Sequence, residues 1–168
     1  MLTTIAALAL AAAPAPSAHQ RDVEQAIFEL CPRAMAGSLA LDDPAQVAAA
    51  GYEPAPPRDT PGGPMAQIGR GTGTERILVS VRREDDEATC AVWFGGPRNR
   101  LLLRAVRRRA RTAGYRGGGP LRLGDGTPIQ MLRQTGGERH SLTIIEANAG
   151  GDLEFVPVTT VIVMTPHD

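Results

Sequence analysis

Lysine is absent from this chain of 168 residues, and all 18 of its basic side chains are arginines. They balance 18 Asp and Glu side chains, so the formal net charge is zero. Because nucleic-acid binding by charge alone needs an excess of positive charge, we expect no nucleic acid among the partners. A GC-rich genome accounts for arginine in place of lysine and for the many Ala, Gly and Pro residues. High arginine use, together with the export predicted below, indicates a bacterial envelope or periplasmic protein.

Long hydrophobic runs are also missing, since the apolar run at residues 2–13 is shorter than the roughly 20 residues that span a bilayer. Residues 1–18 carry no charged side chain, and the run ends in a small-x-small site, Ala15-Pro16-Ser17. This layout is typical of a secretory signal. We therefore predict that residues 1–18 are a cleaved leader and that residues 19–168 form one exported domain, periplasmic or secreted, without a membrane span. A buried helix is the alternative, although Pro14 and Pro16 would interrupt it.

Cysteine occurs only twice, as Cys31 and Cys90. An even number of cysteines in an exported chain predicts a disulfide. The 58 residues between them make a long loop, and closing it would stabilise the fold by about 4 kcal/mol. Two isolated thiols are too few for a zinc site with four ligands, and no C-x-x-C pair is present for redox exchange.

Catalytic and cofactor motifs are missing as well. The chain has neither the G-x-S-x-G turn of serine hydrolases nor the H-E-x-x-H helix of zinc proteases. Two of the three histidines, His19 and His167, lie at the ends of the mature chain, where side chains are rarely held rigidly. His140 directly precedes Ser141 in a predicted strand, which sends the two side chains to opposite faces. We predict no metal and no cofactor, and we leave open whether the chain is an enzyme.

Three segments show helical signals. Apolar positions recur at helical spacing over residues 20–31, and Pro32 is expected to end or kink this helix. A shorter helix is predicted over residues 44–50, with an aspartate before it as N-cap. The strongest helix covers residues 99–113. The Pro- and Gly-rich stretch 53–64 is predicted to be an ordered loop.

Alternating apolar residues and turn signals predict six strands. They cover residues 65–69, 76–83, 88–94, 128–134, 140–146 and 153–164. Their order relative to the helices predicts the α+β class, with an antiparallel sheet of about six strands and helices on one face.

The segment that begins at residue 50 is similar to the one that begins at residue 113. A shift of 63 gives 11 identities in the 27 positions from 50 to 76, without a gap. Ala50-Gly51-Tyr52, for example, matches Ala113-Gly114-Tyr115. We interpret this as an internal duplication of two α-β-β-β units, at about residues 35–97 and 98–164. Turn residues shared by chance are the competing explanation.

The third and the last strand make predictions about the two faces of the sheet. If a disulfide joins Cys90 to the first helix, Val92 and Phe94 also point at the helices, and Trp93 points away. The last strand is apolar on both faces, so the side chains on its second face also have to be shielded from water. Long loops of this chain, or a second copy in a homodimer formed through the last strand, would supply that cover.

Seven arginines lie within fourteen residues, in or just before the helix at 99–113. Like charges four residues apart on a helix cost about 0.2–0.5 kcal/mol per pair. The acidic residues 84–87, together with Glu24 and Glu29, are one source of neutralisation. An acidic protein or an anionic envelope component such as lipid headgroups is the other. The candidate residues for binding an anion or a partner are Arg104, Arg107, Arg108, Arg111 and Trp93.

Two functions of different classes follow from these patterns. The first is a non-catalytic periplasmic or secreted binding module that uses the arginine helix or the face that carries Trp93. The alternative is a small periplasmic hydrolase with its site between the two repeats, near Arg70, Glu75, Arg133 and Glu138. A deep cleft between the repeats favours the hydrolase, whereas a flat apolar or basic patch favours the binding module.

Overall fold

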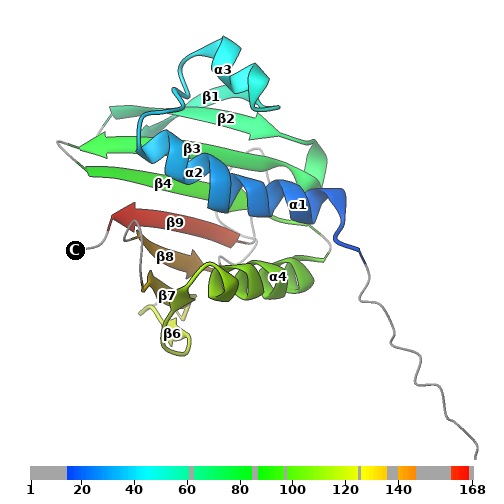
Figure 1. Cartoon of the computed structure of the whole chain (residues 1–168), viewed down its shortest axis with the longest axis vertical. Coiled ribbons are helices and arrows are strands. Elements are labelled where there is room, and N and C mark those ends of the chain that lie inside the picture. The colour runs from blue at the N-terminus through cyan, green and yellow to red at the C-terminus, as the bar shows by residue number, and fades with distance from the viewer. Residues whose placement is uncertain are drawn as a thin grey trace, which may run out of the picture.

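The computed structural model of this protein describes residues 15–60, 63–84, 87–96, 98–124, 126–135, 140–146 and 160–166. Within these residues one sheet of nine strands has the order β1-β2-β3-β4-β9-β8-β7-β5, and β6 pairs with β7. Every pairing is antiparallel. The helix that begins the described chain lies beside α4 on one face of the sheet (Figure 1). The predicted α+β class is confirmed, although the sheet is larger than the six strands expected.

The bounds of the elements are as follows. The strands are β1 (Glu53–Thr60), β2 (Gly63–Arg70), β3 (Ile77–Glu84), β4 (Glu87–Phe94), β5 (Tyr115–Arg116), β6 (Leu121–Arg122), β7 (Pro128–Gln134), β8 (His140–Ile145) and β9 (Thr160–Pro166). The helical elements are α1 (Ala18–Gln25), η1 (Ala26–Leu30), α2 (Cys31–Met35), α3 (Pro44–Ala49), η2 (Gly73–Glu75) and α4 (Asn99–Thr112). Residues 153–159, the first part of the predicted last strand, and residues 1–14 of the predicted leader lie outside the described residues.

The first helix continues past Pro32, because α1, η1 and α2 follow one another without a break. The prediction that it ends at residue 31 is therefore wrong. A proline inside an α-helix clashes with the carbonyl four residues earlier and lacks the N–H that would bond to it. Here η1 is a π turn, in which the N–H of Cys31 donates to the carbonyl of Ala26, five residues back. The wider turn accommodates the proline ring, so the helix reaches Met35.

Residues 53–60 form β1 and residues 63–64 begin β2, so the prediction of a loop there is wrong. Three of the eight residues of β1 are prolines, which lack the N–H that a central strand would need. As the first strand in the sheet order, β1 pairs only with β2. The register shifts between Ala55 and Arg58, where Pro56 and Pro57 form a bulge. An edge position and a bulge together allow a proline-rich sequence to be a strand.

The hydrophobic core lies between the helices and one face of the sheet. Cys90, Val92 and Phe94 are at most 1% exposed and belong to this core, whereas Trp93 packs in a separate cluster on the other face. The predicted orientation of β4 is thus confirmed. Cys31 and Cys90 form the predicted disulfide, with Cα atoms 5.6 Å apart, and it ties the first helix to β4.

The two-unit repeat stays a prediction. The sheet order places β2-β3-β4 and β9-β8-β7 on opposite sides of the β4–β9 pair, as two related units would lie. Two buried tyrosines, Tyr52 and Tyr115, both follow a glycine with positive φ at the end of a helix. The helices differ, however, because the shift of 63 places α4 opposite residues 36–49, where the short α3 is the only helix.

Removal of the disulfide is expected to lower the free energy of unfolding by about 4 kcal/mol, because 59 residues of sequence separate the two cysteines and the unlinked unfolded chain gains entropy. Urea denaturation of C31A/C90A against the oxidised parent measures this. A loss below about 1 kcal/mol would show that packing alone holds the first helix on β4.

Candidate functional site

The arginine-rich helix α4 is fixed to the sheet by its apolar side. Leu103 and Val106 are at most 2% exposed and lie in the main core. At the N-terminal end, Asn99 Nδ2 donates a hydrogen bond of 3.0 Å to Oγ1 of the buried Thr160 in β9. Gly114, with φ of 86°, follows the C-terminal end. The helix is thus held along its length and at its start.

Four arginines form a row on the opposite side of α4. At 100° per residue, Arg100, Arg104, Arg108 and Arg111 fall within one quarter of the helix circumference, and all four are exposed. Their positions span about 16 Å along the helix axis. Within the part of the chain that the structure describes, none of the four guanidinium groups has a hydrogen bond or an ion pair. We call these four residues the arginine row.

Arg107 has a different role, although it was predicted as a partner-binding residue beside the others. Its Nε donates to Gln130 Oε1 of β7 at 3.0 Å, and its Nη2 donates to Glu146 Oε1 at 2.6 Å. The side chains of Arg107 and Glu146 are 27% and 36% exposed, so the ion pair is only partly screened by water. Arg107 therefore anchors the flank of α4 to the sheet.

The acidic residues of the chain do not neutralise the arginine row in the described structure. Glu84 pairs with its neighbour Arg82, and Glu24 accepts a hydrogen bond from Gln20 on its own helix. No ion pair joins Glu29 to α4 among the described residues. Residues 85 and 86 of the predicted acidic turn lie outside them.

Positive charge is also concentrated along the sequence. Residues 88–124 hold nine of the 18 arginines and not one acidic residue. The remaining residues must then carry nine arginines and all 18 carboxylates, so a neutral chain has one strongly basic segment. This uneven distribution of charge, which the net charge of zero does not reveal, gives α4 and its flanks a positive local potential.

Trp93 offers little surface for binding, because its side chain is only 7% exposed. It packs against Met65, Leu78, Ala91 and Val161 on the sheet face away from the helices. The last strand β9 lies in the middle of the sheet, where β4 and β8 use its two edges. A homodimer through the last strand would therefore have to use a face of β9 and not its edge.

The two arginines of the alternative hydrolase site, Arg70 and Arg133, are not brought together. Arg70 lies in β2 and Arg133 in β7, five strand spacings apart in the sheet order, which is about 24 Å. Glu75 is an exposed residue of η2, and Glu138 lies outside the described residues. The two strands that meet at the centre are β4 and β9, so β2 and β7 are far from each other.

Arg70 instead belongs to a cluster that sequence reasoning missed. Its Nη2 lies 3.2 Å from Asp22 Oδ1, its Nη1 donates to Gln25 Oε1 at 3.4 Å, and its guanidinium lies 5.8 Å from the ring centre of Tyr52. The Tyr52 side chain is buried, and its Oη has no hydrogen-bond partner in the described structure. Burial raises the pKa of Tyr52 to about 12, although Arg70 acts in the opposite direction and Asp22 reinforces the rise.

His19 is held firmly, contrary to the expectation for a residue near a chain end. Its Nε2–H donates to the carbonyl of Gly95 at 2.8 Å, which joins the start of α1 to the end of β4. Elsewhere in the described residues, His, Cys, Asp and Glu do not gather in a group of three or more that could hold a metal ion. No described helix has the length and apolar character needed to cross a membrane.

Comparison with models of protein families, with curated proteins and with solved structures finds no match to this chain. The site on α4 therefore has to be interpreted from its own residues.

Two arginines of α4 are expected to respond differently to the same substitution. Arg107→Gln loses the hydrogen bond to Gln130 and the half-buried ion pair with Glu146, which should lower the free energy of unfolding by about 1 kcal/mol. Arg104→Gln removes an exposed side chain without a partner in the described structure. It should change the free energy of unfolding by less than about 0.5 kcal/mol. Urea denaturation of both variants tests this, and equal losses would contradict the anchoring role of Arg107.

The two tyrosines of the chain are expected to ionise late. Burial raises the pKa of Tyr52 to about 12 and also raises the pKa of Tyr115, whereas unfolded tyrosine has a pKa near 10. A native pKa above the unfolded value means that the stability is fully present below pH about 10 and is lost as pH rises towards 12. Titration of tyrosinate absorbance, with circular dichroism as the measure of folding, checks this. A tyrosinate step near pH 10 in folded protein would refute it, and Tyr52→Phe should remove the larger part of the alkaline loss.

Proposed function

We propose that this chain is an exported, disulfide-stabilised binding domain without catalytic activity, and that the arginine row of α4 binds an anionic envelope component or an acidic protein. The observation that carries the proposal is the row itself. Four exposed guanidinium groups, without partners in the described structure, lie along about 16 Å of one helix. Each has five N–H donors and keeps its charge at any physiological pH, which suits carboxylate and phosphate ligands.

The anchoring of α4 supports this proposal. Core packing, the bond from Asn99 to Thr160 and the ion pair from Arg107 to Glu146 fix the helix before any partner arrives. A fixed helix loses less conformational entropy on binding than a mobile segment would. The row is therefore a preformed surface, and only its side-chain ends have to become ordered.

The disulfide and the apolar N-terminal sequence support export. Disulfides form and persist in oxidising compartments such as the bacterial periplasm. The bond between Cys31 and Cys90 is buried, as expected for a structural disulfide. A compartment outside the cytoplasm also offers anionic headgroups as partners for the arginine row.

Binding to vesicles tests the function. We expect the protein to bind vesicles that contain phosphatidylglycerol and not vesicles of phosphatidylcholine alone, with affinity that falls as salt is added. R104Q/R108Q/R111Q should bind about 100-fold more weakly, because each arginine near an anionic surface contributes about 1 kcal/mol. Polyglutamate in place of the vesicles reports on an acidic protein as partner.

The matched control is R21Q/R33Q/R133Q, which removes the same charge from exposed positions outside the basic segment 88–124. It should retain most of the binding. If the control loses as much as the α4 variant, net charge and not the arginine row is responsible. If the parent binds neither vesicles nor polyglutamate, the proposed function is refuted.

A further inference from the structure

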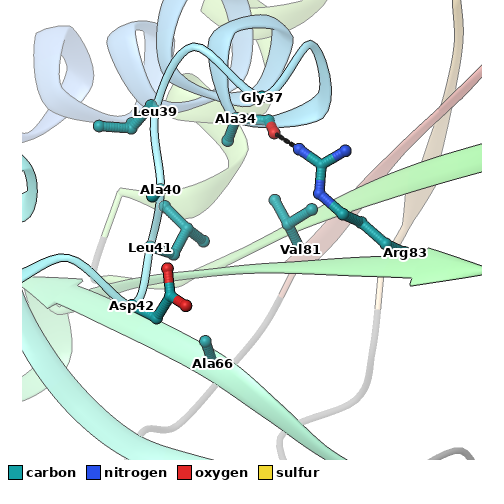
Figure 2. Close-up of a pocket in the computed structure, with 9 residues that line it drawn as sticks. All are labelled: Ala34, Gly37, Leu39, Ala40, Leu41, Asp42, Ala66, Val81 and Arg83. Atoms are coloured by element: carbon teal, nitrogen blue, oxygen red, sulfur yellow. Dashed lines mark hydrogen bonds between the residues drawn. The ribbon is translucent and has the colours of Figure 1, made fainter.

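A pocket of about 430 Å³ lies over β2 and β3, on the half of the sheet that α4 does not cover (Figure 2). Its floor is formed by Ala66 and Val81, which point to the helix side of the sheet. Ala34 at the end of the first helix forms one wall, and the loop with Leu39 and Leu41 forms the other. The volume is in the range of small-molecule sites, about 300–1,000 Å³.

The pocket is open because the helix layer stops short of this part of the sheet. The first helix ends at Met35, and Gly37, at φ of 75°, reverses the chain there. Ala66 consequently remains exposed on the face that the helices cover elsewhere. Small side chains at 34 and 66 leave space that larger apolar residues would have filled.

Opposite charges lie on two sides of this apolar space. Arg83 donates one hydrogen bond from Nη2 to the carbonyl of Ala34, which leaves other guanidinium N–H groups available for a carboxylate. Asp42 lies across the pocket from Arg83 (Figure 2). Its carboxylate is exposed and has no hydrogen bond or ion pair in the described structure.

We propose that this pocket binds a short apolar peptide with free ends. The peptide carboxylate pairs with Arg83, its ammonium group pairs with Asp42, and its apolar side chains lie against Leu41, Ala66 and Val81. A zwitterion with an apolar body is the ligand class that matches one positive and one negative group on either side of an apolar floor. The site is separate from the arginine row and does not depend on the function proposed for it.

The test uses the dipeptide Leu-Leu and two derivatives, Leu-Leu amide and N-acetyl-Leu-Leu, which each lack one charge. Methyl resonances of Leu41, Ala66 and Val81 should shift on titration with Leu-Leu, and each blocked derivative should bind at least about 10-fold more weakly. Arg83→Gln should abolish the preference for Leu-Leu over Leu-Leu amide. Asp42→Asn should abolish the preference for Leu-Leu over N-acetyl-Leu-Leu. R83Q also removes the hydrogen bond to the Ala34 carbonyl, so thermal unfolding of this variant checks that the end of the helix is preserved.

Ala66→Phe fills the pocket and should abolish binding of all three ligands, with thermal unfolding as the check on folding. Equal binding of the three ligands, the absence of methyl shifts, or binding that survives Ala66→Phe would each overturn the proposal. Vesicle binding by R83Q should equal that of the parent, so failure of this site and failure of the arginine row are distinguishable.

Discussion

The pairing of β4 with β9 is the contact on which the rest of the structure depends. It joins the first four strands to the last five through the register from Cys90 opposite Met164 to Phe94 opposite Thr160. Both helices are tied to this pair, the first by the disulfide to Cys90 and α4 by the hydrogen bond from Asn99 to Thr160. The central pair therefore determines where both the arginine row and the pocket lie.

Much of this architecture could be predicted from local patterns. The alternation of apolar residues predicted β3 and β4, and the helical period predicted α4. Both patterns arise because the residues that face the core are apolar. Prediction from the sequence failed where the secondary structure of a segment depends on its surroundings in the fold. Proline-rich β1 is a strand only because it lies at an edge, and the helix passes Pro32 only through a π turn. Strands of two residues, such as β5, are too short for any periodic signal.

The candidate site could be predicted only in part, for a similar reason. The helical period places Arg104 and Arg107 only about 60° apart, so the sequence treats them as equivalent. Gln130 and Glu146 distinguish them, and both lie on other segments of the chain. The alternative hydrolase site placed Arg70 and Arg133 near each other between the two repeats, whereas the sheet order puts five strand spacings between them. The cluster of Tyr52 and Arg70 was missed since its contacts are also distant in sequence.

The like charges of the arginine row lower the stability of the free protein, which bears on the function proposed for the row. Pairs of like charges at Arg100 and Arg104, Arg104 and Arg108, and Arg108 and Arg111 destabilise α4 by about 1 kcal/mol in total. The disulfide stabilises the fold by several times that amount, so the folded state tolerates the repulsion between these arginines. A bound anion would remove it and so stabilise the folded state by mass action. Under the proposed anion-binding role, occupation would thus convert an unfavourable surface into a favourable one, whereas a merely solvated face would gain nothing from keeping its charges in one row.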